Sequence, residues 1–211
     1  MRTPMEVRPD LRQQRDFLFQ AYFGRDGDVI DRIISRAYRD MNRRLPLGKR
    51  NQPEKKKIYG DATELVKSCL HRLLERKVPA DERTLASAFD QWHSDACNQL
   101  RRYYNQPEMG VACTYGHAQK WINMTLKYFW YFPEADLPPE LTPWFPVAHI
   151  PVDKLILNAV VAKGVVARPP CRIWSGWNSE KEYQDFQTNI RNHAASKSTI
   201  PLMLESQWWS K

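Results

Sequence analysis

Residues 118–132 read AQKWINMTLKYFWYF, and this stretch decides the fold of the chain. Its apolar side chains cover almost the whole surface of the helix that it predicts, and no glycine or proline interrupts it. A helix that is apolar on nearly all sides usually lies inside a protein, where other elements cover it. The stretch therefore predicts a central helix around which the remaining segments pack.

The segments outside this stretch are also mostly helical in pattern. Apolar side chains recur every three to four residues, which is typical of helices, in residues 10–23, 28–42, 61–77, 81–104, 153–163, 179–193 and 200–209. Residues 43–60 and 164–178 are expected to be loops. Residues 133–151 carry six prolines, which predict an ordered, extended connection and not a helix.

These patterns predict an all-α fold for a single domain of residues 1–211. We expect two lobes, formed roughly by 1–60 with 164–211 and by 61–163, with a cleft between them. The hydrophobic fraction of 42% and the charged fraction of 27% are typical of a globular protein. No apolar run is long enough to span a membrane, and the first 20 residues lack a signal peptide, so a cytoplasmic monomer without membrane contact is expected.

The four cysteines are scattered and form no C-x-x-C pair. This spacing argues against a zinc ribbon or an iron–sulfur loop, so we expect reduced thiols, no metal site and no cofactor.

Positive charge is concentrated at the N-terminal end. The net charge of the chain is +8, and residues 1–60 hold fifteen Lys or Arg against eight Asp or Glu, a net of +7. Such a segment attracts a polyanion and supports phosphate contacts. We therefore expect nucleic acid as the partner, with a grip formed by the basic residues Arg43, Arg44, Lys49, Arg50, Lys55, Lys56 and Lys57.

Two residues suggest chemistry at a sugar carbon. Lys120 lies near the start of the central helix, where apolar neighbours and the helix dipole disfavour a protonated amine. Asp153 follows Pro151 at the expected N-cap of the next helix, where backbone amides hold a carboxylate in its charged form. An amine nucleophile beside a fixed anion suits a reaction in which positive charge develops on a sugar.

The pattern Gly116-x-x-x-Lys120, a long helix, and then Pro151-Val152-Asp153 heading another helix resembles the helix-hairpin-helix DNA glycosylases. The likeness is closest to the 8-oxoguanine group with its archaeal branch, and it covers roughly residues 105–163. The usual hairpin turn has two glycines, whereas only Gly116 stands here, and 33 residues separate the lysine from the aspartate.

The resemblance implies an enzyme that flips a damaged or modified base out of double-stranded DNA and excises it. Lys120 would be the Schiff-base nucleophile, with Lys127 as the other candidate amine, and Asp153 its electrostatic and proton-accepting partner. The hairpin residues Gly116, His117 and Gln119 would contact DNA. A base pocket is expected from Trp144, Phe145, His149, Trp121 and Lys127.

Several alternatives stay open at this stage. The base could be oxidised guanine, a modified cytosine or another altered base, and the enzyme could act in repair or in defence against modified foreign DNA. It could use Lys120 as an abasic-site lyase, or Asp153 alone to support attack by water. A non-catalytic basic DNA-binding module and a protein-interaction factor are the other functions considered.

Overall fold

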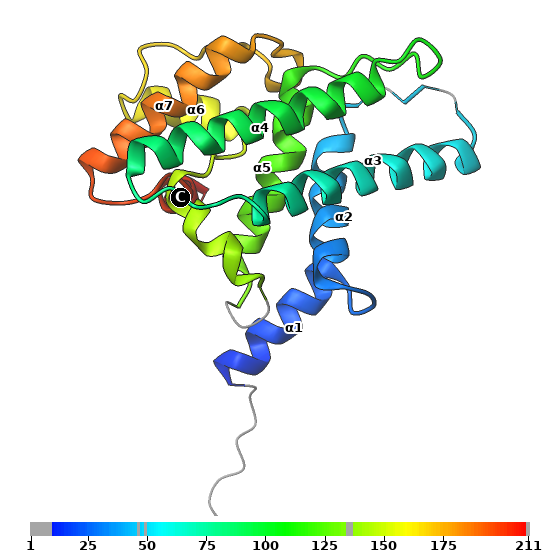
Figure 1. Ribbon diagram of the computed structural model, residues 1–211, viewed down its shortest axis with the longest axis horizontal. Helices are drawn as coiled ribbons and strands as arrows, with labels where there is room; N and C mark the ends of the chain where they lie inside the picture. The colour runs from blue at the N-terminus through cyan, green and yellow to red at the C-terminus, as the bar shows by residue number, and fades with distance from the viewer. Residues whose placement is uncertain (1–9, 46, 49, 134–136, 210–211) are drawn as a thin grey trace, which may run out of the picture.

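The computed structural model describes residues 10–45, 47–48, 50–133 and 137–209, and every regular element within them is a helix (Figure 1). This confirms the all-α prediction. The elements are α1 (Leu11–Phe23), α2 (Val29–Asn42), α3 (Gln52–Leu74), α4 (Glu82–Tyr104), α5 (Tyr115–Tyr131), η2 (Pro139–Val147), α6 (Lys154–Ala162), η3 (Trp174–Gly176), α7 (Glu180–Ser196) and α8 (Pro201–Trp209), where η marks a 3₁₀ helix.

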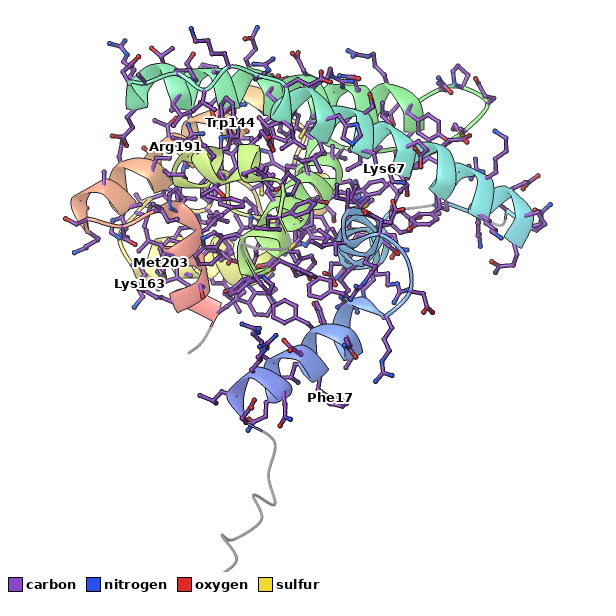
Figure 2. All side chains as sticks on the ribbon, turned by 60° about the horizontal axis from the view of Figure 1, so that its bottom comes forward. Phe17, Lys67, Trp144, Lys163, Arg191 and Met203 are labelled. Atoms are coloured by element: carbon purple, nitrogen blue, oxygen red, sulfur yellow. The ribbon has the colours of Figure 1, made fainter. Side chains whose placement is uncertain are left out.

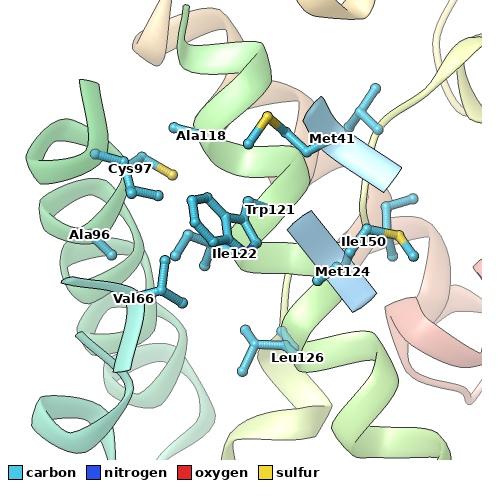
Figure 3. Close-up of a cluster of buried hydrophobic side chains, with 14 of the residues drawn as sticks. Met41, Val66, Ala96, Cys97, Ala118, Trp121, Ile122, Met124, Leu126 and Ile150 are labelled. Carbon is cyan, nitrogen blue, oxygen red and sulfur yellow. The ribbon is translucent and has the colours of Figure 1, made fainter. Parts of the chain in front are cut away.

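Helix α5 is the centre of the fold, as its apolar sequence predicts. Its residues 115–129 are all buried, and α2, α4, η2 and η3 pack around it. Figure 3 shows Trp121 of α5 among side chains of neighbouring helices, including Met41 and Val66. The indole Nε1 of Trp121 donates a hydrogen bond to the Ile34 carbonyl at 3.1 Å, so α2 and α5 are joined by a polar contact as well as by packing.

Helix α2 is amphipathic and lies along α5 (Figure 1). Its N-cap is Asp28, whose carboxylate accepts a hydrogen bond from the Ile30 amide at 2.7 Å. Its buried face consists of Ile33, Ile34, Ala37, Tyr38 and Met41. The opposite face therefore carries the polar residues of the helix.

Helix α3 begins nine residues earlier than the sequence predicts, so the expected loop over 43–60 is wrong for residues 52–60. Asn51 is the N-cap, and Asn51 and Glu54 form a capping box. Pro53 fits the first turn because its missing N–H has no helical partner there. The helix then continues through Gly60, since the residues that follow bury a side against the core.

Residues 139–147 form the 3₁₀ helix η2, which corrects the expectation of an extended, non-helical connection. Its side chains Leu141, Trp144, Phe145 and Val147 are buried, and this burial holds the proline-rich segment in place. The chain then runs through buried residues 148–152 to Asp153 at the start of α6. The connection is thus ordered, as predicted, but partly helical.

Helix α1 lies at the edge of the molecule (Figure 1) and has no buried residue. Phe19 and Phe23 pack against Phe132 at centroid distances of 4.9 Å, whereas Phe17 is 63% exposed (Figure 2). Buried side chains from α2 to α8 form one hydrophobic cluster. Within the described ranges no helix has the length and apolarity needed to cross a membrane.

Candidate active site

Lys120 and Asp153 meet at a surface pocket. The Lys120 ammonium donates a hydrogen bond to Asp153 Oδ2 at 3.0 Å, although 33 residues separate them. Their side chains are 7% and 17% exposed, so the pair is largely buried but still reaches the pocket. The pocket has a volume of about 370 Å³, and its other lining residues are Tyr22, Asp40, Arg43, Met124, Lys127, Tyr128, Trp174 and Trp209.

Asp153 is fixed at both carboxylate oxygens. Oδ1 accepts the Ile156 amide at 3.0 Å as the N-cap of α6, and Oδ2 accepts the Lys120 ammonium. The N-cap prediction is therefore confirmed. The side chain cannot rotate without losing one of the two bonds, so the carboxylate is held toward Lys120.

Buried amide side chains also fix the backbone that leads to Asp153. Gln119 donates to the Val152 carbonyl and accepts the Val152 amide, each at 3.2 Å. Asn123 donates to the Ile150 carbonyl at 3.1 Å. Gln187 of α7 holds both polar backbone groups of Ile150, at 2.9 and 3.1 Å. The backbone of residues 150–152 is thus hydrogen-bonded to side chains of α5 and α7. Gln119 is also the neighbour of Lys120 in the sequence.

Gln119 was expected to contact DNA, and the structure corrects this. Its side chain is fully buried, and its four hydrogen bonds go to Gly116, Val152 and Asn123. Because Gln119 is fully buried, its polar atoms must find partners inside the protein.

Gly116 and His117 are likewise buried and bonded within the protein, so neither faces DNA directly. The Gly116 amide donates to the Trp177 carbonyl at 2.8 Å, and a Cβ at Gly116 would lie 1.8 Å from the Trp174 carbonyl oxygen. His117 is 3% exposed, its Nε2 donates to the Arg44 carbonyl at 2.8 Å, and burial lowers its pKa. These residues therefore place Trp174 and the Arg43–Arg44 turn.

The expected base pocket is mostly wrong in its residues. Trp121 is buried in the core and bonded to α2, and Trp144 and Phe145 are 1% and 7% exposed, away from the pocket lining. His149 is 1% exposed, and its Nε2 donates to Asp90 at 2.8 Å. Of the five expected residues only Lys127 lines the pocket.

The aromatic walls come from elsewhere in the chain. Trp174 of η3 and Trp209 of α8 line the pocket together with Tyr22 and Tyr128. Neither tryptophan is among the residues that the sequence analysis assigns to a base pocket. The two tryptophans lie 54 and 89 residues from Lys120 in the sequence, which leaves no local signal for this role.

Lys127 lies two turns from Lys120 and reaches the same pocket. Its ammonium lies 2.6 Å from Glu205 Oε1 and 5.1 Å from the centre of the Trp209 ring. Glu205 is fully buried, and this burial raises the pKa of its carboxyl group. Lys120 differs from Lys127 because its carboxylate partner, Asp153, also lines the pocket, whereas Glu205 does not.

A second polar cluster, which the sequence did not reveal, forms another part of the wall. The Tyr128 hydroxyl donates to the Asp40 carboxylate, and it lies 2.8 Å from the Tyr22 hydroxyl. Arg36 donates to the Tyr22 hydroxyl at 2.8 Å, and its guanidinium carbon lies 3.9 Å from the Tyr22 ring centre. Burial raises the pKa of Tyr128, so its hydroxyl stays protonated and remains a donor.

The basic residues expected to grip DNA are divided between two places. Arg43 and Arg44 are exposed at the end of α2, and Arg43 lines the pocket. Lys55 and Lys56 line a separate hollow beside Tyr59. Lys57 pairs with Asp61 at 2.9 Å, Arg50 donates to the Leu47 carbonyl, and Lys49 is outside the described residues.

Among the described residues no group of three or more His, Cys, Asp or Glu side chains could hold a metal ion. Comparison with protein-family models, with curated proteins and with solved structures found no match.

Proposed function

We propose that the protein is a DNA N-glycosylase that receives an extruded base in the Lys120 pocket. The observation that carries the proposal is the Lys120–Asp153 pair at 3.0 Å in a hollow of about 370 Å³. This volume is within the usual range of small-ligand pockets. A base within a duplex cannot reach such a hollow, so the nucleotide must leave the stack first.

The chemistry follows from the two charged groups. The Lys120 ammonium first passes a proton to Asp153 Oδ2, which lies within hydrogen-bond distance. The neutral amine attacks C1′ of the deoxyribose, a C–N bond to the lysine forms, and the glycosidic bond breaks. The base leaves with the bonding electron pair and takes up the proton that Asp153 received, which restores the carboxylate. The carboxylate stabilises the positive charge that develops on the sugar.

The lysine adduct then has two outcomes. Loss of a proton and opening of the sugar ring convert it to a Schiff base, from which the strand can be cleaved at the abasic site. In the other version Lys120 stays protonated, and water attacks C1′ with Asp153 stabilising the charge. Both versions release the base, and they differ in whether a covalent protein–DNA adduct forms.

The walls of the pocket suit a nucleobase. Trp174 and Trp209 offer aromatic faces on which a base can stack. Asp40 and Tyr128 supply oxygen atoms for the polar edges of a base, whereas Arg43 supplies a cation at the end of α2. Stacking contacts of this kind contribute about 1–3 kcal/mol for each base.

The test is base release from a panel of modified-base duplexes, followed by alkali cleavage and a gel. The panel begins with 8-oxoguanine, which the resemblance suggests, and includes modified cytosines. We expect Lys120→Gln and Asp153→Asn to abolish release while duplex binding survives. The matched control is Lys163→Gln, at the exposed C-cap lysine of α6 (Figure 2), which lies outside the pocket lining.

Borohydride trapping separates the two amines. An adduct that forms in Lys127→Gln but not in Lys120→Gln identifies Lys120 as the nucleophile, and the reverse result identifies Lys127. Undiminished base release by both Lys120→Gln and Asp153→Asn would defeat the proposal.

A further inference from the structure

Three arginines of α2 and its C-cap, Arg43, lie on one face. Arg32, Arg36, Arg39 and Arg43 are spaced by four, three and four residues, which places them in a single stripe. The stripe is opposite the face that packs on α5. With a rise of 1.5 Å per residue, it is roughly 16 Å long.

Three of these arginines have no carboxylate partner among the described residues. Arg36 pairs with Asp40 at 3.2 Å, but no ion pair is formed by Arg32, Arg39 or Arg43 within that part of the chain. The buried Nε of Arg32 also lacks a hydrogen-bond acceptor there. Three of the four arginines thus present donors without carboxylate acceptors in the described chain, whereas Arg36 is bonded to Asp40 and to Tyr22.

The stripe joins two hollows. Arg32 and Arg39 line a pocket of about 410 Å³ between α2 and α3, and the same pocket contains the unpartnered, buried hydroxyl of Thr63. Arg43, at the other end of the stripe, lines the Lys120 pocket. A chain of phosphates that follows the stripe would therefore arrive at Lys120.

We propose that this stripe is the surface on which the sugar-phosphate backbone of DNA lies beside the extruded nucleotide. The proposal rests on the function proposed above and names the part of the protein that holds the substrate. It is needed because Gly116, His117 and Gln119, which were expected to hold DNA, are buried and bonded internally.

Spacing and chemistry both favour a phosphodiester backbone. Arg32 and Arg39 are seven residues apart, as are Arg36 and Arg43. Each such step is roughly 10 Å, which equals the rise of about three base pairs along the axis of B-form DNA. The planar guanidinium group can donate two parallel hydrogen bonds to a phosphate. Three separate arginines therefore suit a row of phosphates better than a single carboxylate partner.

The test measures the salt dependence of binding to an unmodified duplex between 50 and 200 mM KCl. The triple variant Arg32→Gln, Arg39→Gln, Arg43→Gln is compared with a control triple that removes the same charge from α4 and the α3–α4 loop, at the exposed residues Lys77, Arg83 and Arg102. Circular dichroism of both proteins shows whether they fold as the wild type does.

The loss of three phosphate contacts makes the negative slope of log K against log salt shallower by about 2.7. The loss of affinity across this salt range then becomes about 40-fold smaller than in the wild type. We expect this change in the stripe variant and an unchanged slope in the control. An unchanged slope in the stripe variant, or an equal change in the control, would overturn the proposal.

The design separates this proposal from the glycosylase itself. A wild-type protein that releases a base while the stripe variant keeps its slope refutes only the stripe. A wild-type protein that binds no duplex at 50 mM KCl refutes both.

Discussion

The Gln119 side chain is bonded to the backbone of Val152, just before Asp153, and we call this contact the clamp. Gln119→Met removes the clamp and nearly preserves the length of the side chain. In the wild type the Gln119 amide satisfies both the N–H and the C=O of Val152, and Val152 is fully buried. A thioether cannot replace these bonds, so two buried backbone groups lose their side-chain partner. Each unsatisfied group costs about 1–3 kcal/mol, and the expected loss in free energy of unfolding is roughly 2–6 kcal/mol.

Thr125→Val is the matched control on the same helix. Thr125 is also buried, but its hydroxyl only donates back to the Trp121 carbonyl one turn earlier. Removing it leaves no backbone N–H without a partner, so a loss below about 1 kcal/mol is expected. Both variants are compared with the wild type by urea unfolding followed by circular dichroism.

The clamp also has a functional readout. At temperatures where Gln119→Met is fully folded, we expect kcat for base release to fall more than KM changes, because the clamp acts on the position of Asp153 and not on DNA contacts. A loss of stability no larger than that of Thr125→Val would refute the clamp. So would an unaltered kcat in the folded variant.

Two further predictions concern the fold. Gly116→Ala should destabilise the protein because its Cβ would lie 1.8 Å from the Trp174 carbonyl oxygen. Gly60→Ala within α3 should stabilise it by about 0.5–1 kcal/mol, since no atom lies within 4 Å of the added Cβ. Melting temperatures of the two variants that shifted in the same direction would contradict this. Burial, aided by the positive charge of Arg191, lowers the pKa of His149 to about 4, so the unfolded state takes up a proton before the folded state does. The contribution of His149 to the free energy of unfolding should therefore be full above about pH 6.5 and fall by roughly 3 kcal/mol as the pH drops to about 4. Urea titrations at pH 7, 5.5 and 4.5 measure this. The same pH dependence of unfolding in His149→Gln would assign the loss to other groups.

Local signals predicted the elements that carry the site. The apolar run of α5 and the capping Asp153 each act through near neighbours, so pattern and position suffice to find them. The start of α3 was missed because its proline, glycine and lysines resemble a loop. Packing against neighbouring helices and the Asn51 cap outweigh these residues.

The pocket was only partly predictable. The sequence pattern identified Lys120 and Asp153, but Tyr22, Asp40 and Trp209 are brought to them by tertiary contacts between distant helices. No periodicity encodes such contacts. One available signal was overlooked, however: a polar residue in a helix that is apolar all round must be bonded internally, and this applies to Gln119 and Asn123.

The position of the tryptophans gives this protein a built-in optical reporter. Trp174 and Trp209 line the pocket, and Trp209 is 51% exposed, whereas Trp121 and Trp144 are shielded in the interior. A base stacked on the two pocket indoles would quench their emission and leave the emission of the interior indoles in place. Occupancy of the pocket could thus be followed during a single turnover without attaching a dye.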